Sequence, residues 1–238
     1  FSYQDRQPIN AKIVQRLRPT LTLMGSAILL SIIIAVPLGI LSAIRQYSFI
    51  DYFSTVAGFT TISIPSFFLS LAAIYIFSLK LGWLPSGDIA TIGKQGSLLD
   101  SLKHLLLPAL VLGLAEAAPL IRYTRSSMLE VLRQDYVRTA RAKGAAEFIV
   151  IWKHMFRNTL IPVITILGPA LAGLIVSGVT IEAMFAFPGM GFDFFRAISN
   201  RDYSMIMGTS LLFAALIVIA NMSVDILYGL VDPRVRVE

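Results

Sequence analysis

The most constraining feature of this sequence is a set of five long apolar runs that carry almost no charge. Leu21–Ile44 has no charged residue over 24 positions, and Tyr52–Leu79 has none over 28. A helix of about 20 residues is long enough to cross a hydrocarbon core of about 30 Å. Only 14% of the residues are charged and the mean hydropathy is +0.75, so lipid must be part of the solvent. The sequence predicts an all-α, polytopic membrane helical bundle with spans near 21–44, 52–79, 105–121, 158–187 and 203–230.

Composition also excludes several classes of function. Cysteine is absent, which rules out disulfides, thiol nucleophiles and zinc–thiolate sites. The only histidines, His104 and His154, lie far apart, and no metal site is expected. An intramembrane enzyme would need a Gly-x-Gly-Asp pair, a His-Glu-x-x-His run or a serine with a base, and none is present. The net charge of +6 indicates anionic lipid or a membrane-side partner rather than nucleic acid.

The distribution of Lys and Arg predicts the orientation of the spans. Eight of them fall in 122–157, which predicts that this loop and the C-terminus lie on the cytoplasmic side of the membrane. Alternation then puts 1–20, 80–104 and 188–202 outside, although 1–20 itself carries four basic residues. We interpret 1–20 as an outer-surface segment that a first span, missing from this sequence, would precede. The alternative is five spans with an exported N-terminus.

The 122–157 loop is too patterned for a simple connector. Residues 126–133 read as a continuation of the third span's helix, and a further helix is expected to begin near Glu147. Between them, Asp135 to Gly144 reads as a short helix that the glycine stops. A short helix on the cytoplasmic side of the membrane, between two long helices, could serve as a docking element that transmits movement from another protein. The alternative is a solvated basic loop that only sets topology.

Several segments resemble known proteins. Residues 135–164 resemble the cytoplasmic "EAA" loop of binding-protein-dependent ABC importer permeases, with Arg138-Thr139-Ala140 in the Glu-Ala-Ala place and Gly144 as the following glycine. The first acid and the final proline of the general pattern are replaced, as in the dipeptide/oligopeptide/nickel branch with its Arg-Thr-Ala-Arg-Ala-Lys-Gly run. Further segments resemble that branch in order along the chain, namely 81–85, 124–132, 181–191, 201–203, 224–229 and 232–234.

This resemblance implies a function. It implies one transmembrane domain over 1–238 with the type I ABC importer fold, forming half of a pathway for peptides. It implies four partners: a second homologous permease, two ATPase subunits that bind ATP and Mg, an exported binding protein, and the lipid bilayer. The chain has no Gly-x-x-x-x-Gly-Lys-Ser/Thr run, so it is expected to be a transport subunit rather than an enzyme, with no cofactor of its own. The residues implied to contact an ATPase are Asp135, Tyr136, Arg138, Thr139, Ala140, Arg141, Lys143 and Gly144.

Three acids, Glu116, Glu182 and Asp225, lie inside the apolar runs, where charges usually face protein or water, and Asp225 is interpreted as a structural residue near the cytoplasmic interface. Glu182, with the Pro188-Gly189 break that follows it, is interpreted either as part of a gate or translocation path or as a hydrogen-bond acceptor for nearby backbone. Glu116 is a further path residue to consider. Nickel or glutathione-like cargo, a channel and a secondary transporter remain as alternatives.

Overall fold

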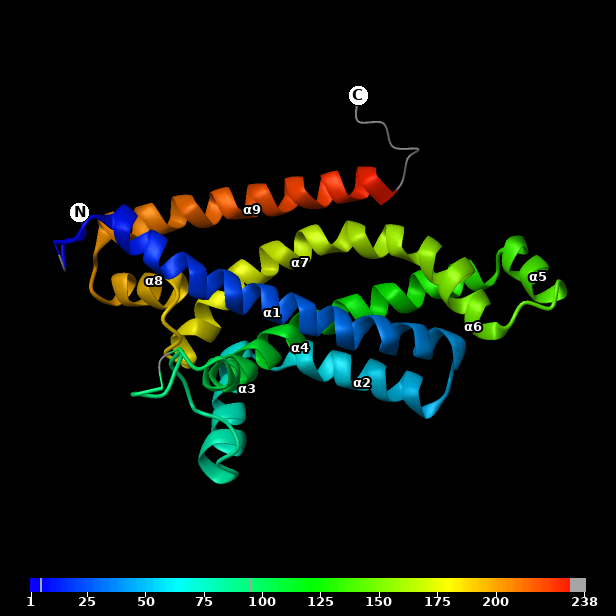
Figure 1. Ribbon diagram of the computed structural model, residues 1–238, viewed down its shortest axis with the longest axis horizontal. Helices are drawn as coiled ribbons and strands as arrows, with labels where there is room; N and C mark the ends of the chain where they lie inside the picture. The colour runs from blue at the N-terminus through cyan, green and yellow to red at the C-terminus, as the bar shows by residue number, and fades with distance from the viewer. Residues whose placement is uncertain (5, 95, 232–238) are drawn as a thin grey trace. The chain divides into compact units, whose positions relative to one another are not determined.

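The computed structural model describes residues 1–4, 6–94 and 96–231, and all regular secondary structure within these ranges is helical (Figure 1). The motif at 232–234 lies outside the described residues. The described residues divide into two compact units, one formed by 1–30, 64–115 and 172–219 and the other by 31–63, 116–171 and 220–231. The elements are α1 (Ile9–Ile44), α2 (Phe49–Ser63), α3 (Ser66–Ala73), the π-helical η1 (Ile74–Lys80), α4 (Leu98–Leu132), α5 (Asp135–Ala142), α6 (Glu147–Ile149), the π-helical η2 (Val150–Phe156), α7 (Arg157–Met184), α8 (Met190–Ser199) and α9 (Tyr203–Val231).

Four helices, α1, α4, α7 and α9, each contain a stretch that is long and apolar enough to cross a membrane. A fifth span results if α2 is counted together with the segment from Ser66 to Lys80 as one broken span. The break falls at Pro65, which has no N–H to donate and whose ring disfavours a helical conformation at the preceding residue. Prolines 37, 108, 119 and 169, by contrast, lie within uninterrupted helices.

Two boundaries differ from the sequence prediction. The expected division between a surface segment at 1–20 and a span at 21 is absent, because α1 begins at Ile9 and continues for 36 residues. The third span, expected at 105–121, belongs to the 35-residue helix α4, which begins earlier, at Leu98, while its end at Leu132 confirms the predicted continuation over 126–133. Both helices therefore extend well past the apolar core that their sequences indicate. The reason is that helical hydrogen bonding does not stop where hydrophobicity does.

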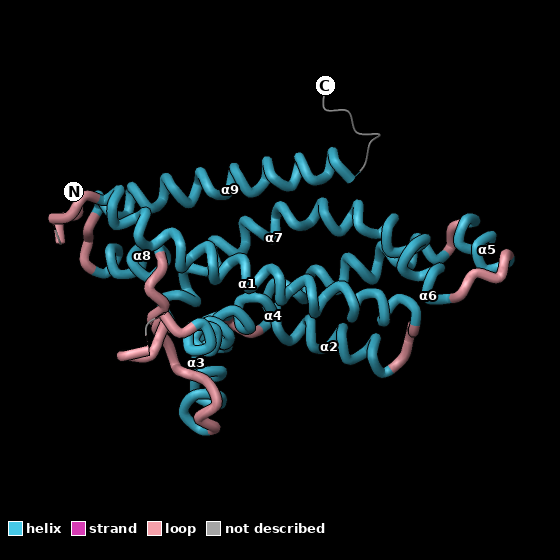
Figure 2. The backbone as a smooth tube through the Cα atoms, viewed as in Figure 1, coloured by secondary structure: helices cyan, strands magenta, loops and turns pink. Residues whose placement is uncertain are grey.

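In the first unit, the segment between η1 and α4 is drawn mainly as loop in Figure 2. Polar contacts to neighbouring residues hold this loop. The backbone N–H of Asp88 donates to the carbonyl of Phe185 over 3.0 Å. The imidazole of His104 contacts the carbonyl of Gly87, with Nδ1 2.6 Å from the oxygen. A side chain at position 87 would collide with the backbone of Phe185, so the close approach requires glycine there.

In the second unit, apolar side chains join the helices in two clusters. One contains Ala35 of α1, Ala117 and Leu120 of α4, and Val163 of α7, all buried. The other gathers residues near the ends of α1 and α4 together with residues of α5 and η2: Val36, Ile40, Ala43, Met128, Val137, Ala140, Val150 and Met155. This second cluster packs the 122–157 loop against two of the long helices.

Candidate functional site

The short helix α5 ends in a hydrogen-bonded C-terminal motif centred on Gly144. The N–H of Gly144 donates to the carbonyl of Arg141 over 2.9 Å, and the N–H of Ala145 donates to the carbonyl of Ala140 over 3.2 Å. This 5→2 and 6→1 pair defines a Schellman motif, in which the residue after the helix is left-handed. Gly144 has φ +77°, a conformation that is easily available only to glycine. The prediction of a short helix stopped by this glycine is confirmed.

One face of α5 is buried and fixes its position. The side chains of Val137 and Ala140 are 0% and 8% exposed, and they lie in the same apolar cluster as Val36 and Ile40 of α1. The hydroxyl of Tyr136 accepts a hydrogen bond from the Asn158 amide at 3.0 Å. Because α5 packs on the ends of α1 and α4, a displacement of α5 would be transmitted to those helices through packed side chains and not only through the connecting chain.

The opposite face of α5 is exposed and carries most of the predicted contact residues: Asp135, Tyr136, Arg138, Thr139, Arg141, Lys143 and Gly144. Ala140 faces the buried cluster instead. Arg138 Nη1 lies 3.9 Å from Asp135 Oδ1, the pairing expected from their spacing. Contact of Arg138 and Arg141 with a partner stays a prediction.

Arg141 is already engaged within the chain. Its Nη2 lies 2.6 Å from Glu147 Oε1, and its Nε donates to the second carboxylate oxygen over 3.2 Å. The hydrogen bonds from Arg141 lower the pKa of Glu147 although desolvation opposes them. This bidentate pair bridges α5 to the start of α6, so Arg141 sets the shape of the turn around Gly144.

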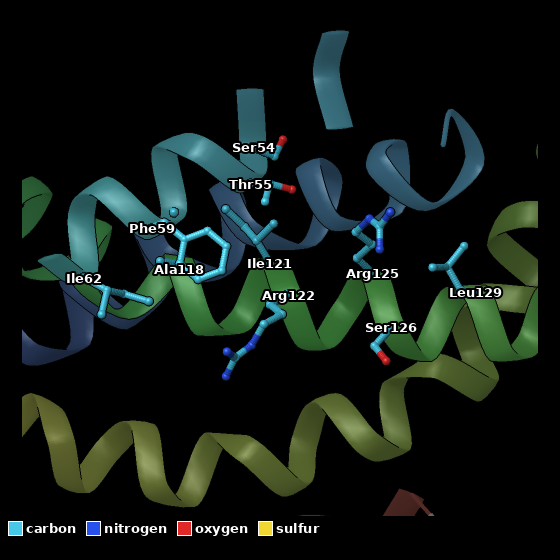
Figure 3. Close-up of a pocket in the computed structure, with 11 residues that line it drawn as sticks. Ser54, Thr55, Phe59, Ile62, Ala118, Ile121, Arg122, Arg125, Ser126 and Leu129 are labelled. Atoms are coloured by element: carbon cyan, nitrogen blue, oxygen red, sulfur yellow. The ribbon is translucent and has the colours of Figure 1, made fainter. Parts of the chain in front are cut away.

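A cavity of about 330 Å³ lies between α2 and α4 (Figure 3). Near the cavity, Arg125 donates two hydrogen bonds to Asp51, from Nε to Oδ1 over 2.7 Å and from Nη2 to Oδ2 over 2.8 Å. The carboxylate of Asp51 is almost completely buried, with 6% of the side chain exposed. The cavity is lined on the α2 side by Thr55 and Phe59 and on the α4 side by Ala118 and Arg122. Its lining combines apolar surface with a few polar groups, as small-molecule sites do.

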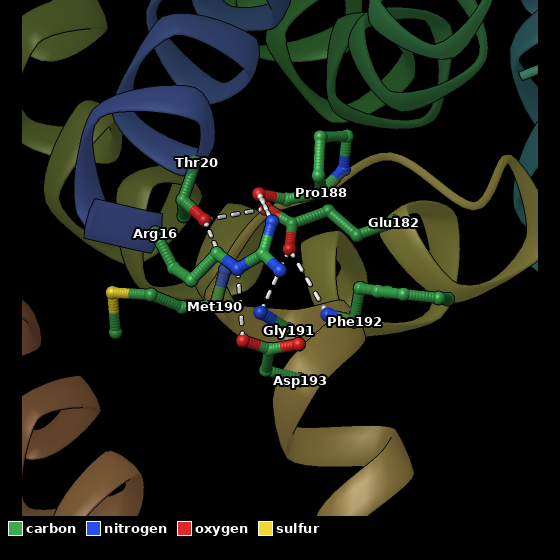
Figure 4. Close-up of polar contacts among 8 residues, drawn as sticks. All are labelled: Arg16, Thr20, Glu182, Pro188, Met190, Gly191, Phe192 and Asp193. Carbon is green, nitrogen blue, oxygen red and sulfur yellow. Dashed lines mark hydrogen bonds and ion pairs between the residues drawn. The ribbon is translucent and has the colours of Figure 1, made fainter. Parts of the chain in front are cut away.

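In the first unit, Glu182 binds the N-terminus of α8 (Figure 4). Its side chain is 0% exposed. One carboxylate oxygen accepts the hydroxyl of Thr20 at 2.7 Å, and the other accepts the N–H groups of Gly191 and Phe192 at 2.7 and 3.1 Å. The Thr20 hydroxyl oxygen in turn accepts the N–H of Met190 at 2.8 Å. A carboxylate from α7 thus caps a helix whose own N-cap, a glycine, has no side chain to do so.

The Pro188-Gly189 break lies directly before α8 and takes part in the same set of contacts. The carbonyl of Pro188 accepts Arg16 Nη1 at 3.2 Å, while Arg16 Nε donates to Asp193 over 2.9 Å. A Cβ on Gly189 would collide with the Glu182 carboxylate, which explains why glycine follows the proline. Of the two interpretations of Glu182, this geometry supports the backbone acceptor, although its bonds go to the first turn of α8 rather than to the proline itself.

Glu116, the remaining site residue expected from the sequence, lies in the second unit and not with Glu182. It lines a cavity of about 240 Å³ together with Pro119 and Tyr123 of α4 and with Ile166 and Pro169 of α7. Its side chain is partly exposed. The predicted site residues therefore form three separate groups: the α5 face, the cap of α8 and the cavity beside Glu116.

Sequence reasoning missed two residues at the cap of α8, Thr20 and Arg16, and also the pair formed by Asp51 and Arg125 near the cavity between α2 and α4. A signal existed for the last two, since Asp51 directly precedes one apolar run and Arg125 closely follows another. Because successive spans alternate in direction, the end of the run beside Asp51 and the end beside Arg125 belong on the same side of the membrane. No comparable signal pointed to Thr20, a hydroxyl residue next to a run of apolar residues.

These features define a class of protein. It has several helices that are apolar and long enough to cross a membrane, and between two of them, α4 and α7, it presents a short helix with one buried face and one exposed face. Residues 35–237 match the family described as "Binding-protein-dependent transport system inner membrane component". The chain is 45% identical over 229 residues to the oligopeptide transport system permease protein AppB of Bacillus subtilis, covering 96% of this chain and 72% of that protein. It is 35% identical over 257 residues to the dipeptide transport system permease protein DppB of Escherichia coli, covering 99% and 76%.

The fold agrees with this relationship. A solved structure described as an inward-facing conformation of the MetNI methionine ABC transporter aligns with a TM-score of 0.76 at 16% identity, covering 95% of this chain and 99% of the other. The chain therefore belongs to the family of inner membrane components of binding-protein-dependent transport systems. It is a transport permease with the fold of ABC importer transmembrane subunits.

Proposed function

We propose that this chain carries peptides across the inner membrane as half of a translocation pathway, driven by ATPase subunits that bind the exposed face of α5. The names of the two relatives above support peptides as the cargo. In this proposal, residues 122–157 and the C-terminus are cytoplasmic, a second homologous permease completes the pathway, and an exported binding protein delivers the peptide. ATP and Mg are bound by the ATPases.

The packing of α5 is the observation that carries the proposal. A topogenic loop needs only positive charge, and has no need for a buried face. Here Val137 and Ala140 join the ends of α1 and α4 in one apolar cluster, while the charged face of the same helix is open. Movement imposed on that open face by closing ATPases would pass directly to two long helices.

Uptake by the reconstituted complex tests the cargo and the energy source. The chain, the second permease, the ATPases and the binding protein would be assembled in proteoliposomes and supplied with labelled tripeptide, nickel or glutathione. We expect tripeptide accumulation that requires both ATP and binding protein. Accumulation without ATP would instead identify a secondary transporter or channel, and accumulation of nickel or glutathione alone would reassign the cargo.

Crosslinking tests the docking surface. The chain has no native cysteine, so a cysteine at Arg138 would be unique. Carrying a photoreactive group, Arg138→Cys should attach to an ATPase subunit in the assembled complex. Ile92→Cys, also highly exposed at 93% but in the loop before α4, is the matched control and should not. Equal labelling from both positions, or none from Arg138→Cys, would contradict docking through α5.

A further inference from the structure

Helix α4 carries a polar, accessible stripe within an otherwise apolar stretch. The stripe consists of Glu116, Arg122, Tyr123 and Ser126, all partly or fully exposed, while Leu112, Ala117 and Leu120 of the same helix are buried. A charged side chain facing lipid at the middle of a membrane costs about 3 kcal/mol or more. The carboxylate of Glu116 lies inside the apolar run and therefore indicates contact with water, protein or a ligand rather than with hydrocarbon, while Arg122 lies where this run meets the proposed cytoplasmic segment.

Both charges of the stripe lack a counter-charge within the described residues. Arg122 lies over the ring of Tyr123, 5.4 Å from its centroid, and forms no ion pair there. Glu116 accepts no hydrogen bond from any described group. One turn further along α4, Arg125 is by contrast fully paired with Asp51. Figure 3 shows Arg122 and Arg125 leaving α4 on opposite sides.

Each unpaired charge borders a cavity in the same compact unit. Glu116 lines the space of about 240 Å³ next to α7, and Arg122 lines the space of about 330 Å³ next to α2. Six residues along a helix correspond to a rise of about 9 Å and place the two side chains about 120° apart around the axis. Tyr123 lies between them on this wheel and lines the cavity beside Glu116.

We propose that the stripe is a subsite for the two terminal charges of a short peptide, an inference that rests on the proposed peptide cargo. The carboxylate of Glu116 accepts the peptide's α-ammonium, and the guanidinium of Arg122 binds its α-carboxylate through paired N–H donors. An extended tripeptide spans about 10 Å, which matches the axial separation of the two groups, and the long side chain of Arg122 has to bridge their remaining offset around the helix. The subsite recognises the two termini, and Tyr123 lies against the peptide backbone. It therefore does not select among the side chains of the peptide.

Capped peptides test each charge separately. Uptake of trialanine, N-acetyl-trialanine and trialanine amide would be measured in the complete reconstituted complex, with saturating amounts of loaded binding protein. We expect Glu116→Gln to lower trialanine uptake about tenfold or more and to leave N-acetyl-trialanine uptake unchanged. Arg122→Gln should spare the amide in the same way. Glu130→Gln, an exposed carboxylate further along α4, is the matched control and should change none of the three.

Exchanging the charges provides a second test that needs no capped peptide. Glu116→Arg and Arg122→Glu should each abolish trialanine uptake, while the double variant should restore part of it, because the peptide can bind in reverse. An equal loss for free and capped peptides, with reduced recovery of the complex, would show that Glu116 pairs with another subunit and would overturn the subsite. Normal trialanine uptake by Glu116→Gln would also overturn it. If the unaltered complex transports no peptide but another solute, the proposed function itself fails.

Discussion

Replacing Gly144 tests whether the direction of α5 controls coupling. At φ +77°, an L-residue with a Cβ is destabilised by about 1–2 kcal/mol in the left-handed region, and β-branched residues are genuine outliers there. A Cβ at this position would meet no atom within 4 Å, so no steric collision adds to the backbone term. The cost therefore falls on the turn alone, and 1–2 kcal/mol changes the population of the native turn by a factor of about 5–30.

Three variants separate this conformational effect from others. Asparagine tolerates the left-handed region better than most residues, so Gly144→Asn should retain most coupling, Gly144→Ala should lose part and Gly144→Val should lose most. The readouts are peptide uptake and binding-protein-stimulated ATP hydrolysis by the reconstituted complex, with complex recovery as the check on folding. Equal activity of all three variants would refute the reasoning. Failure of Gly144→Asn as severe as that of Gly144→Val would show that a partner fills the space beside the glycine.

Four further results are expected. Glu182→Gln keeps one accepting oxygen but loses the carboxylate that caps α8, and should cost about 1–2 kcal/mol, seen as a lower thermal midpoint of the solubilised complex; an unchanged midpoint would contradict the cap. Gly191→Ala places a Cβ 2.6 Å from a backbone atom of α7 and should destabilise by about 1–3 kcal/mol in the same assay, so full stability would show that the contact can open. Asp51→Ala leaves its arginine partner unpaired and should cost about 2 kcal/mol, with Asp51→Asn intermediate; indistinguishable variants would argue against the ion pair. A cysteine at Lys143 should resist impermeant thiol reagents in intact cells while one at Ile92 reacts, and the reverse pattern would invert the proposed orientation.

Local features of this fold were accessible from the sequence because they depend on local chemistry. The start of α5 at Asp135 and its stop near Gly144 follow from helix-termination rules, and the interruption at Pro65 follows from the missing N–H. Hydrophobicity located the spans but not their ends, since α1 and α4 continue as helices beyond their apolar runs.

Side-chain partners were much less accessible, because they depend on which distant segments meet. Arg138 and Arg141 look equivalent on a helical wheel, yet only Arg141 finds Glu147 across the turn. Glu182 was recognised as a buried acid, but its hydroxyl donor, Thr20, lies 162 positions earlier in the chain. Spacing within one helix carries no information about such a contact.

The pairing of Arg16 with Asp193 has a consequence for the synthesis of the chain. The two residues are 177 positions apart, and at about 5–20 residues per second the ribosome needs about 10–35 seconds to reach the second after the first. During that interval the guanidinium of Arg16 and the hydroxyl of Thr20 have none of their final partners on α8. The start of α1 must therefore stay near water, or be held by the insertion machinery, until α8 is made. A chain that ends before Asp193 would therefore leave the guanidinium of Arg16 without its carboxylate partner.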